Sequence, residues 1–169
     1  MAVPDEDSAR PSPEEYQAFV RGLELADVRL VGCDVSAQEM IEDPNRVVLD
    51  LDQETAFNVF EGGFEAVQEY QFYFLDRENA DELGQIDAAF GFVYETEQSA
   101  VPADLDRYLE VFSFVSLPVN VWPFAREFVH NMTMRLGWPR LDLPLLKPGM
   151  DEGDDTSSTK APMGESDEE

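Results

Sequence analysis

From residue 28 to residue 95, hydrophobic and polar side chains largely alternate with a period of two in four segments of the chain. This alternation predicts β-strands, because successive side chains of a strand point to opposite faces of a sheet. The four segments are residues 28–35, 46–52, 64–75 and 84–95. Residues 53–60 are ambiguous, and one interpretation adds them to the second strand. Consecutive strands joined by short polar turns favour an antiparallel sheet.

Helical spacing occurs before and after these strands. Residues 12–25 open with the capping-box sequence Ser-Pro-Glu-Glu and continue with apolar residues at i, i+3, i+4 and i+7, which predicts an amphipathic helix ending near Leu25. Residues 105–112 carry a second helical pattern. A third helix is predicted after Asn120, the expected N-cap, with Pro123 in its first turn and Gly137 as its C-terminal glycine.

The length of 169 residues favours a single domain. We expect residues 1–11 to form a disordered acidic arm, residues 12–148 to form the folded domain, and residues 149–169 to form a disordered acidic tail. The N-terminal residues lack the basic and apolar regions of a signal peptide, and no apolar run approaches the length of a membrane span. These features predict a cytoplasmic protein.

Negative charge dominates the composition. The net charge is −26, from 37 acidic and 11 basic residues. Residues 151–169 hold eight acids and one Lys, which leaves −19 on the rest of the chain. Nucleic acid is excluded as a partner, because phosphate backbones are bound through Lys and Arg. Anionic membrane surfaces are disfavoured for the same reason.

Candidate sites for chemistry are weak. His130 lies three residues after Glu127, the spacing of a di-iron helix, but a second such pair is missing and a surface histidine is the favoured interpretation. Residues Asp50, Asp52 and Glu54 alternate like calcium ligands, yet the Gly and the distal Glu of a calcium loop are missing. The single cysteine, Cys33, is expected to pack as a small apolar residue. We therefore predict no catalytic residue, no metal ligand, no cofactor and no enzymatic activity.

The strands at residues 64–75 and 84–95 carry apolar side chains on both faces, although a half-exposed sheet needs only one apolar face. Burial against helices or within an oligomer explains this pattern. An exposed apolar groove that binds a partner explains it equally well. The patterning alone does not separate the two explanations.

Two segments resemble a known family. The sequence V-V-L-D-L-D at residues 47–52 resembles the second-strand motif of SecB export chaperones. Pro-Phe-Ala-Arg-Glu at residues 123–127 resembles the SecB helix, and the residues that follow resemble its exit. The matching residues of this second part are Met132, Arg135, Gly137, Pro139, Leu141, Leu143 and Pro144. The resemblance extends over residues 26–148.

The resemblance implies an α+β fold, in which a four-stranded antiparallel sheet carries helices on one side. It also implies a homotetramer built as a dimer of dimers, with the long helices between joined sheets. The implied activity is that of an ATP-independent holdase, which binds unfolded preproteins for Sec-dependent export and hands them to SecA.

Site residues follow from the same resemblance. By matching position, Val47, Leu49 and Leu51 would line a client-binding groove. Phe57 and Phe60 are expected beside them, from the strand pattern alone. The oligomer interface would then use apolar and aromatic residues of the last helix, namely Trp122, Phe124, Phe128 and Met132.

This chain also departs from typical SecB proteins. The capped helix at residues 12–25 is an addition, and the acidic tail replaces a C-terminal helix. Asp27 matches one acidic position that docks SecA, whereas Val31 and Val93 fall at others. Two alternatives to export therefore stay open: a SecB-like chaperone that guards an antitoxin, and a structural oligomer without chaperone activity.

Overall fold

The computed structural model describes residues 10–96, 102–139, 141 and 143. In chain order, its helices and strands are α1 (Pro13–Arg21), β1 (Glu24–Ala37), the short 3₁₀ helix η2 (Pro44–Arg46), β2 (Val47–Phe60), β3 (Gly63–Asp76), β4 (Glu82–Glu95), α2 (Leu105–Val115) and α3 (Leu117–Arg135). Residues 1–9 of the predicted arm and all of the predicted tail lie outside the described residues. Their disorder stays a prediction.

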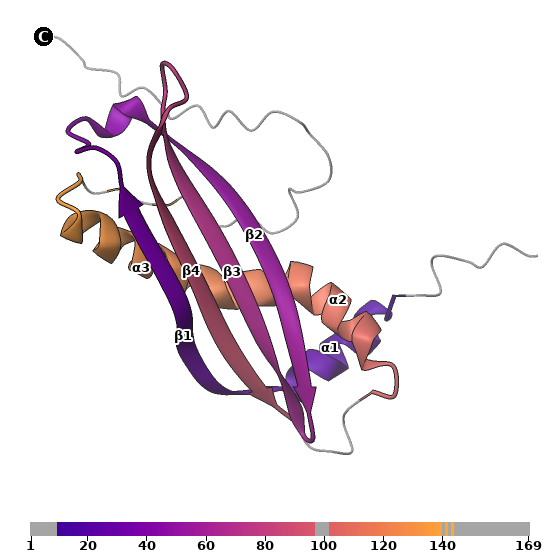
Figure 1. Ribbon diagram of the computed structural model, residues 1–169. Coiled ribbons are helices and arrows are strands. Elements are labelled where there is room, and N and C mark those ends of the chain that lie inside the picture. Colours follow the sequence, from indigo (N-terminus) through magenta and orange to yellow (C-terminus); the bar gives the residue numbers. More distant parts are fainter. Residues whose placement is uncertain (1–9, 97–101, 140, 142, 144–169) are drawn as a thin grey trace, which may run out of the picture.

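The four strands form one sheet in the order β1-β4-β3-β2, and every neighbouring pair is antiparallel. Figure 1 shows the helices on one face of this sheet, with α3 crossing it diagonally. The predicted α+β architecture is therefore confirmed. β1 and β2 are the two edge strands, and residues 53–60 belong to β2.

Side chains of β3 and β4 that point toward the helices form the core, because their alternation directs one complete row of each strand to that face. Every member of these two rows is buried. They are Phe64, Ala66, Gln68, Tyr70, Phe72 and Phe74 on β3, and Ile86, Ala88, Phe90, Phe92 and Tyr94 on β4. We refer to the helix-covered side of the sheet as the inner face and to the opposite side as the outer face.

α1 begins as predicted, because the Ser12 hydroxyl accepts the Glu15 N–H at 3.3 Å and the Glu15 carboxylate accepts the Ser12 N–H at 2.8 Å. The second of these bonds stabilises the ionised carboxylate and lowers the pKa of Glu15. The predicted end near Leu25 is wrong: the helix ends at Arg21, and β1 begins at Glu24. Phe19, in the second turn of the helix, is buried in the core. Its ring packs on that of Phe64, with the two ring centroids 6.3 Å apart.

The predicted start of the last helix is also wrong. Only Ser116 separates α2 from α3, which begins at Leu117, a fully buried residue. Pro118 takes the place in the first turn that tolerates a missing N–H, so Pro123 lies inside the helix. Asn120 is not a cap; its side-chain amide donates a hydrogen bond to the Tyr94 hydroxyl at 2.9 Å.

The predicted glycine at the end of α3 is confirmed. Gly137 has φ of +74°, the left-handed conformation that glycine adopts without strain. Its N–H donates to Met134 at 3.1 Å, and the N–H of Trp138 donates to Thr133 at 3.0 Å, which together satisfy two of the last carbonyls of the helix.

Cys33 is exposed, contrary to the prediction that it packs as an apolar residue. It pairs with the buried Ala88 of β4 but lies on edge strand β1, where most side chains stay accessible. The alternation of the sequence identified this strand correctly but could not identify it as an edge.

Candidate binding surfaces

β2 presents apolar side chains on the inner face at the edge of the sheet. Val47, Leu49, Leu51 and Phe57 are half-buried and pack against the core, and we call these four residues the β2 row. α3 lies across β3 and β4, where Trp122 contacts Tyr70 and Phe72 of β3. The β2 row lies at the margin of this cover and keeps part of its apolar surface accessible.

The β2 row is interrupted in its middle by two polar residues, Gln53 and Thr55. The Thr55 hydroxyl donates to the side-chain oxygen of Gln68 at 2.6 Å, and Gln68 is only 2 % exposed. This bond gives a buried amide oxygen a partner, which it requires in an apolar environment. The apolar surface therefore has one part at Leu49 and Leu51 and another at Phe57.

Phe60, the fifth residue predicted to bind clients, lies on the outer face. It pairs with Gly63, and a Cβ built on Gly63 would lie 3.0 Å from the Phe60 ring carbons. Along a regular strand, odd- and even-numbered residues lie on opposite faces of the sheet, so Phe60 is expected on the face opposite to Leu49 and Leu51. That signal was in the sequence, but it required residues 53–60 to be assigned firmly to β2.

The outer face of β2 is acidic. Asp50, Asp52 and Glu54 are exposed there, in register with Tyr73, Gln71 and Glu69 of β3. Desolvation, and then the charges of Asp52 and Asp87, raise the pKa of Tyr73. Within the part of the chain that the structure describes, no group of three or more His, Cys, Asp or Glu side chains is placed to hold a metal ion. His130 lies half-buried on α3.

Asp27, predicted to dock a partner, is exposed on the outer face of β1 and pairs with Val93 of β4. Val31 lies at a register shift of β1 and covers the backbone of Gly91. An acid on the same face, Glu65, is already engaged by Arg29 at 2.5 Å. The neighbours of Asp27 are thus either apolar, as Val31 and Val93 are, or already paired with an opposite charge, as Glu65 is. The role of Asp27 in docking stays a prediction.

A groove of about 230 Å³ runs between β1 and α3, with Leu30 and Phe124 on its walls. These two side chains are 47 % and 40 % exposed. Phe128 lines the same groove, and Met132 lies half-buried one turn further along α3. The three residues Phe124, Phe128 and Met132 therefore keep surface available for the predicted oligomer interface.

Trp122 differs from those three residues, because it is only 7 % exposed and packs on its own sheet, with its ring centroid 5.7 Å from that of Tyr70. Its place in the core of the chain argues against the predicted role at an interface. The residue lies on the flank of α3 that faces β3, whereas Phe124 contacts Phe92 of β4.

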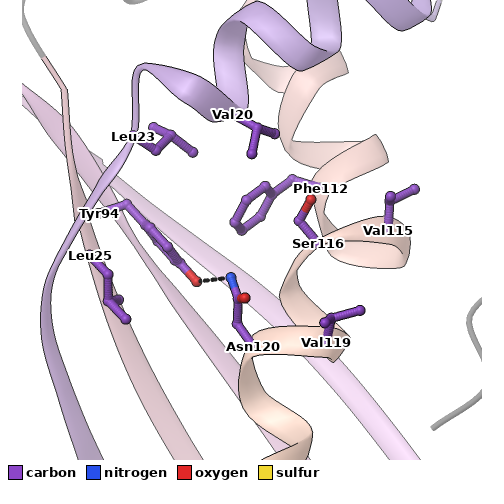
Figure 2. Close-up of a pocket in the computed structure, with 9 residues that line it drawn as sticks. All are labelled: Val20, Leu23, Leu25, Tyr94, Phe112, Val115, Ser116, Val119 and Asn120. Carbon is purple, nitrogen blue, oxygen red and sulfur yellow. Dashed lines mark hydrogen bonds between the residues drawn. The ribbon is translucent and has the colours of Figure 1, made fainter.

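A third apolar surface was missed at the sequence level. A pocket of about 440 Å³ opens where α1 leads into β1, beside the junction of α2 and α3. Figure 2 shows the Tyr94 hydroxyl and the Asn120 amide pointing toward each other there, and burial raises the pKa of Tyr94. The lining residues are Val20, Leu23, Leu25, Tyr94, Phe112, Val115, Ser116, Val119 and Asn120. They come from five elements and from two of the links between them, so no local motif reveals the pocket.

These features define a scaffold in which one helix-backed antiparallel sheet leaves apolar surface open along both edges. No family model matches the sequence, and a search of curated proteins found no significant match. A solved structure does match: the SecB-like chaperone Rv1957 of Mycobacterium tuberculosis in complex with a ChAD peptide from the Rv1956 HigA1 antitoxin. The TM-score is 0.70 at 18 % identity, covering 81 % of this chain and 99 % of that one.

The chain therefore has the fold of a SecB-like chaperone, and the resemblance seen in the sequence motifs is confirmed at the level of the fold. A protein of unknown function from Streptococcus agalactiae also matches, over 73 % of this chain and 97 % of that one at 14 % identity, but its TM-score of 0.37 carries no argument. In the described part of the chain, no helix is both long enough and apolar enough to span a membrane.

Proposed function

We propose that this protein is a SecB-like holdase chaperone that binds unfolded polypeptide without ATP. The observation that carries the proposal is the half-exposed apolar row on edge strand β2, on a fold shared with a chaperone described in complex with a peptide. The β2 row includes the motif residues that resemble the SecB client groove. The activity needs neither a cofactor nor a catalytic residue, and it belongs in the cytoplasm.

Partial exposure of the β2 row suits reversible capture. Complete burial of one leucine side chain is worth about 1.5–3 kcal/mol, and Leu49 and Leu51 retain only part of that gain for a client because the core already covers part of each. Several such contacts, distributed along an extended client, give useful affinity while each remains weak. An unfolded chain offers many apolar segments of this kind.

The test replaces both leucines, Leu49→Ser and Leu51→Ser, and measures how well the protein suppresses aggregation of an unfolded client. We expect suppression to fall about tenfold or more, since burial of the two leucine side chains against a client is worth roughly 1.4 kcal/mol or more. The matched control carries Val48→Ser and Phe60→Ser, which change two outer-face side chains of the same strand. Equal loss in both variants, or none in either, would contradict the proposed site.

The client class divides into two candidates. We first propose unfolded preproteins, captured for Sec-dependent export and delivered to SecA, as the sequence resemblance implies. The specific observation that favours a second candidate, an antitoxin, is the ChAD peptide bound by Rv1957. The surroundings of Asp27 also favour the antitoxin, because they leave Asp27 as an isolated acid for docking SecA. One isolated exposed ion pair contributes only about 0–1 kcal/mol and cannot by itself hold the basic SecA tail.

Calorimetry separates the two roles. We expect a SecA tail peptide to bind weakly and to lose affinity with added salt, because only exposed surface charges attract it and salt screens such charges. Apolar unfolded segments should bind more tightly and with less dependence on salt. Submicromolar, salt-resistant binding of the SecA peptide would instead support the export role. If the protein neither suppresses aggregation nor binds any of these ligands, the structural-oligomer alternative takes precedence.

A further inference from the structure

The pocket in Figure 2 has an apolar mouth that stays open to solvent. Leu25 of β1, Val115 of α2 and Val119 of α3 line it, and these side chains are 47 %, 50 % and 49 % exposed. Exposed apolar side chains that gather around one concave site usually mark a place where a partner binds. The pocket therefore suits an apolar group that the described part of the chain does not supply.

A buried hydrogen-bond donor lies inside the same pocket. The Tyr94 hydroxyl accepts the Asn120 amide at 2.9 Å, and Tyr94 is only 4 % exposed. No acceptor for the proton of this hydroxyl is found among the described residues. Because buried donors are seldom left unpaired, the fitting group places a carbonyl oxygen beside an apolar side chain. A short stretch of polypeptide has this chemistry.

A cation stands at the end of α1, where the helix leads into the pocket. Arg21 follows the lining residue Val20 and is exposed. Three other arginines of the fold, Arg29, Arg46 and Arg107, each pair with a carboxylate. No ion pair of Arg21 is found within the described residues. A segment that carries acids next to its apolar residues would complement both the pocket and this charge.

We propose that the pocket binds the start of this chain's own N-terminal segment, the sequence Met-Ala-Val-Pro at residues 1–4. Val3 enters the pocket, and a main-chain carbonyl beside it accepts the Tyr94 proton. The acids Asp-Glu-Asp at residues 5–7 follow directly and pair with Arg21. For residues 1–4 this inference replaces the expectation of a disordered arm, and it is independent of the proposed function.

The length of the arm fits this path. The described chain begins at Arg10, two residues before the N-cap Ser12 of α1. An extended chain covers about 3.3–3.6 Å per residue, so the stretch from Arg10 to Val3 reaches up to about 25 Å. The nine residues of α1 are only about 13.5 Å long, at a rise of about 1.5 Å per residue. The arm can thus pass along α1 and reach its far end, which borders the pocket.

The covalent tether makes a modest contact sufficient. A short linker holds its end at a millimolar effective concentration near a site within reach. Two or three small apolar residues therefore occupy the pocket in the intact chain, although the same residues would bind weakly as a free peptide.

Methyl NMR of the full chain tests the contact, because valine and leucine methyl groups occur on both partners. They are Val3 on the arm and Val20, Leu23, Leu25, Val115 and Val119 in the pocket. We expect nuclear Overhauser effects between the methyl groups of Val3 and those of Leu25 or Val119. The variant Val3→Asp should abolish docking and shift the pocket signals, since an apolar wall does not accept an unpaired carboxylate. The matched control Ala9→Asp adds the same charge next to Arg10 and should leave the pocket signals in place.

Titration gives the strength of the contact. A synthetic peptide of residues 1–9, added to the Val3→Asp protein, should return the pocket signals toward their wild-type positions. The same peptide carrying Val3→Asp should bind at least tenfold more weakly. Adding Arg21→Gln to the protein should weaken the unmodified peptide by up to about fivefold at low salt and have little effect at high salt, because an exposed ion pair is weak and screened.

The possible results separate the arm from other occupants. Contacts from Val3 to the pocket that persist in Ala9→Asp support the proposal. Identical pocket signals in the wild type and in Val3→Asp would overturn it, because the arm would then lie elsewhere. With methionine methyl groups labelled as well, pocket contacts from Met163 in place of Val3 would assign the pocket to the C-terminal tail and also overturn the proposal. None of these results bears on the holdase function, which is tested at Leu49 and Leu51.

Discussion

Asp76 carries a buried carboxylate at the end of β3, and its hydrogen bonds make it a determinant of acid stability. Its Oδ1 accepts the Glu78 N–H at 2.8 Å, and its Oδ2 is paired with Arg46. The backbone bond from Glu78, and then the contact with Arg46, lower the pKa of Asp76. A carboxylate whose pKa is lower in the folded state stabilises the protein above its unfolded pKa of about 3.9, and this contribution is lost as the pH falls through the folded value.

The substitution Asp76→Asn should lower the melting temperature at neutral pH, because the neutral amide of Asn cannot form an ion pair with Arg46. The difference from the wild type should begin to shrink as the pH falls below about 4, where Asp76 of the unfolded chain becomes protonated, and should close as the pH falls through the lower pKa of the folded state. Melting curves between pH 7 and pH 2 measure both effects. The control Asp52→Asn, at an exposed position on β2, should follow the wild type. A constant difference between Asp76→Asn and wild type across this range would contradict the assignment.

Among the elements, those with a strong internal period were predictable, and those defined by distant contacts were not. The alternation at Phe64 to Phe74 predicted β3, because four of the six residues on that face are aromatic. It did not identify the buried face, since the opposite face carries apolar residues as well. The start of α3 was missed, since both Pro118 and Pro123 fit a first turn and only the burial of Leu117 decides between them. Nor does any local signal show that β2 is an edge strand, because strand order depends on pairing across the whole sheet.

α1, which is not typical of SecB proteins, is an integral part of the core. Phe19 is 7 % exposed and lies between Phe64, Tyr108 and Phe112, with ring centroids 5.1–6.4 Å away. The same helix is joined to the end of α2 by a hydrogen bond of 2.7 Å between the hydroxyls of Tyr16 and Ser116. It closes one end of the sheet and forms a wall of the pocket in Figure 2.

We expect Phe19→Ala to destabilise the protein by about 3–5 kcal/mol, since it leaves a cavity among aromatic rings that cannot collapse. The milder change Tyr16→Phe removes only the hydroxyl contact and should cost about 1 kcal/mol. Chemical denaturation of both variants gives the two values. If Phe19→Ala unfolds at nearly the wild-type denaturant concentration, α1 does not dock on the core as described.

At the scale of the whole molecule, acidic charge and open apolar surface act in opposite directions. The net charge of −26 opposes the approach of two chains unless salt screens it. The groove between β1 and α3, in contrast, has Leu30 and Phe124 exposed on its walls, and burial of such side chains favours association. Closed symmetric assemblies are the usual way to bury a surface of this kind.

We therefore predict that the protein is a tetramer that depends on α3, and that Phe124→Glu dissociates it, because the new charge would have to be buried at the interface. Light scattering at low and at high salt should give four times the chain mass of 19.1 kDa for the wild type, at least at high salt, and a lower mass for the variant. Phe114→Glu is the matched control: Phe114 is 74 % exposed but lies on α2, outside the groove with Leu30. A wild-type monomer in both conditions would contradict the tetramer. Dissociation by Phe114→Glu but not by Phe124→Glu would move the interface from α3 to α2.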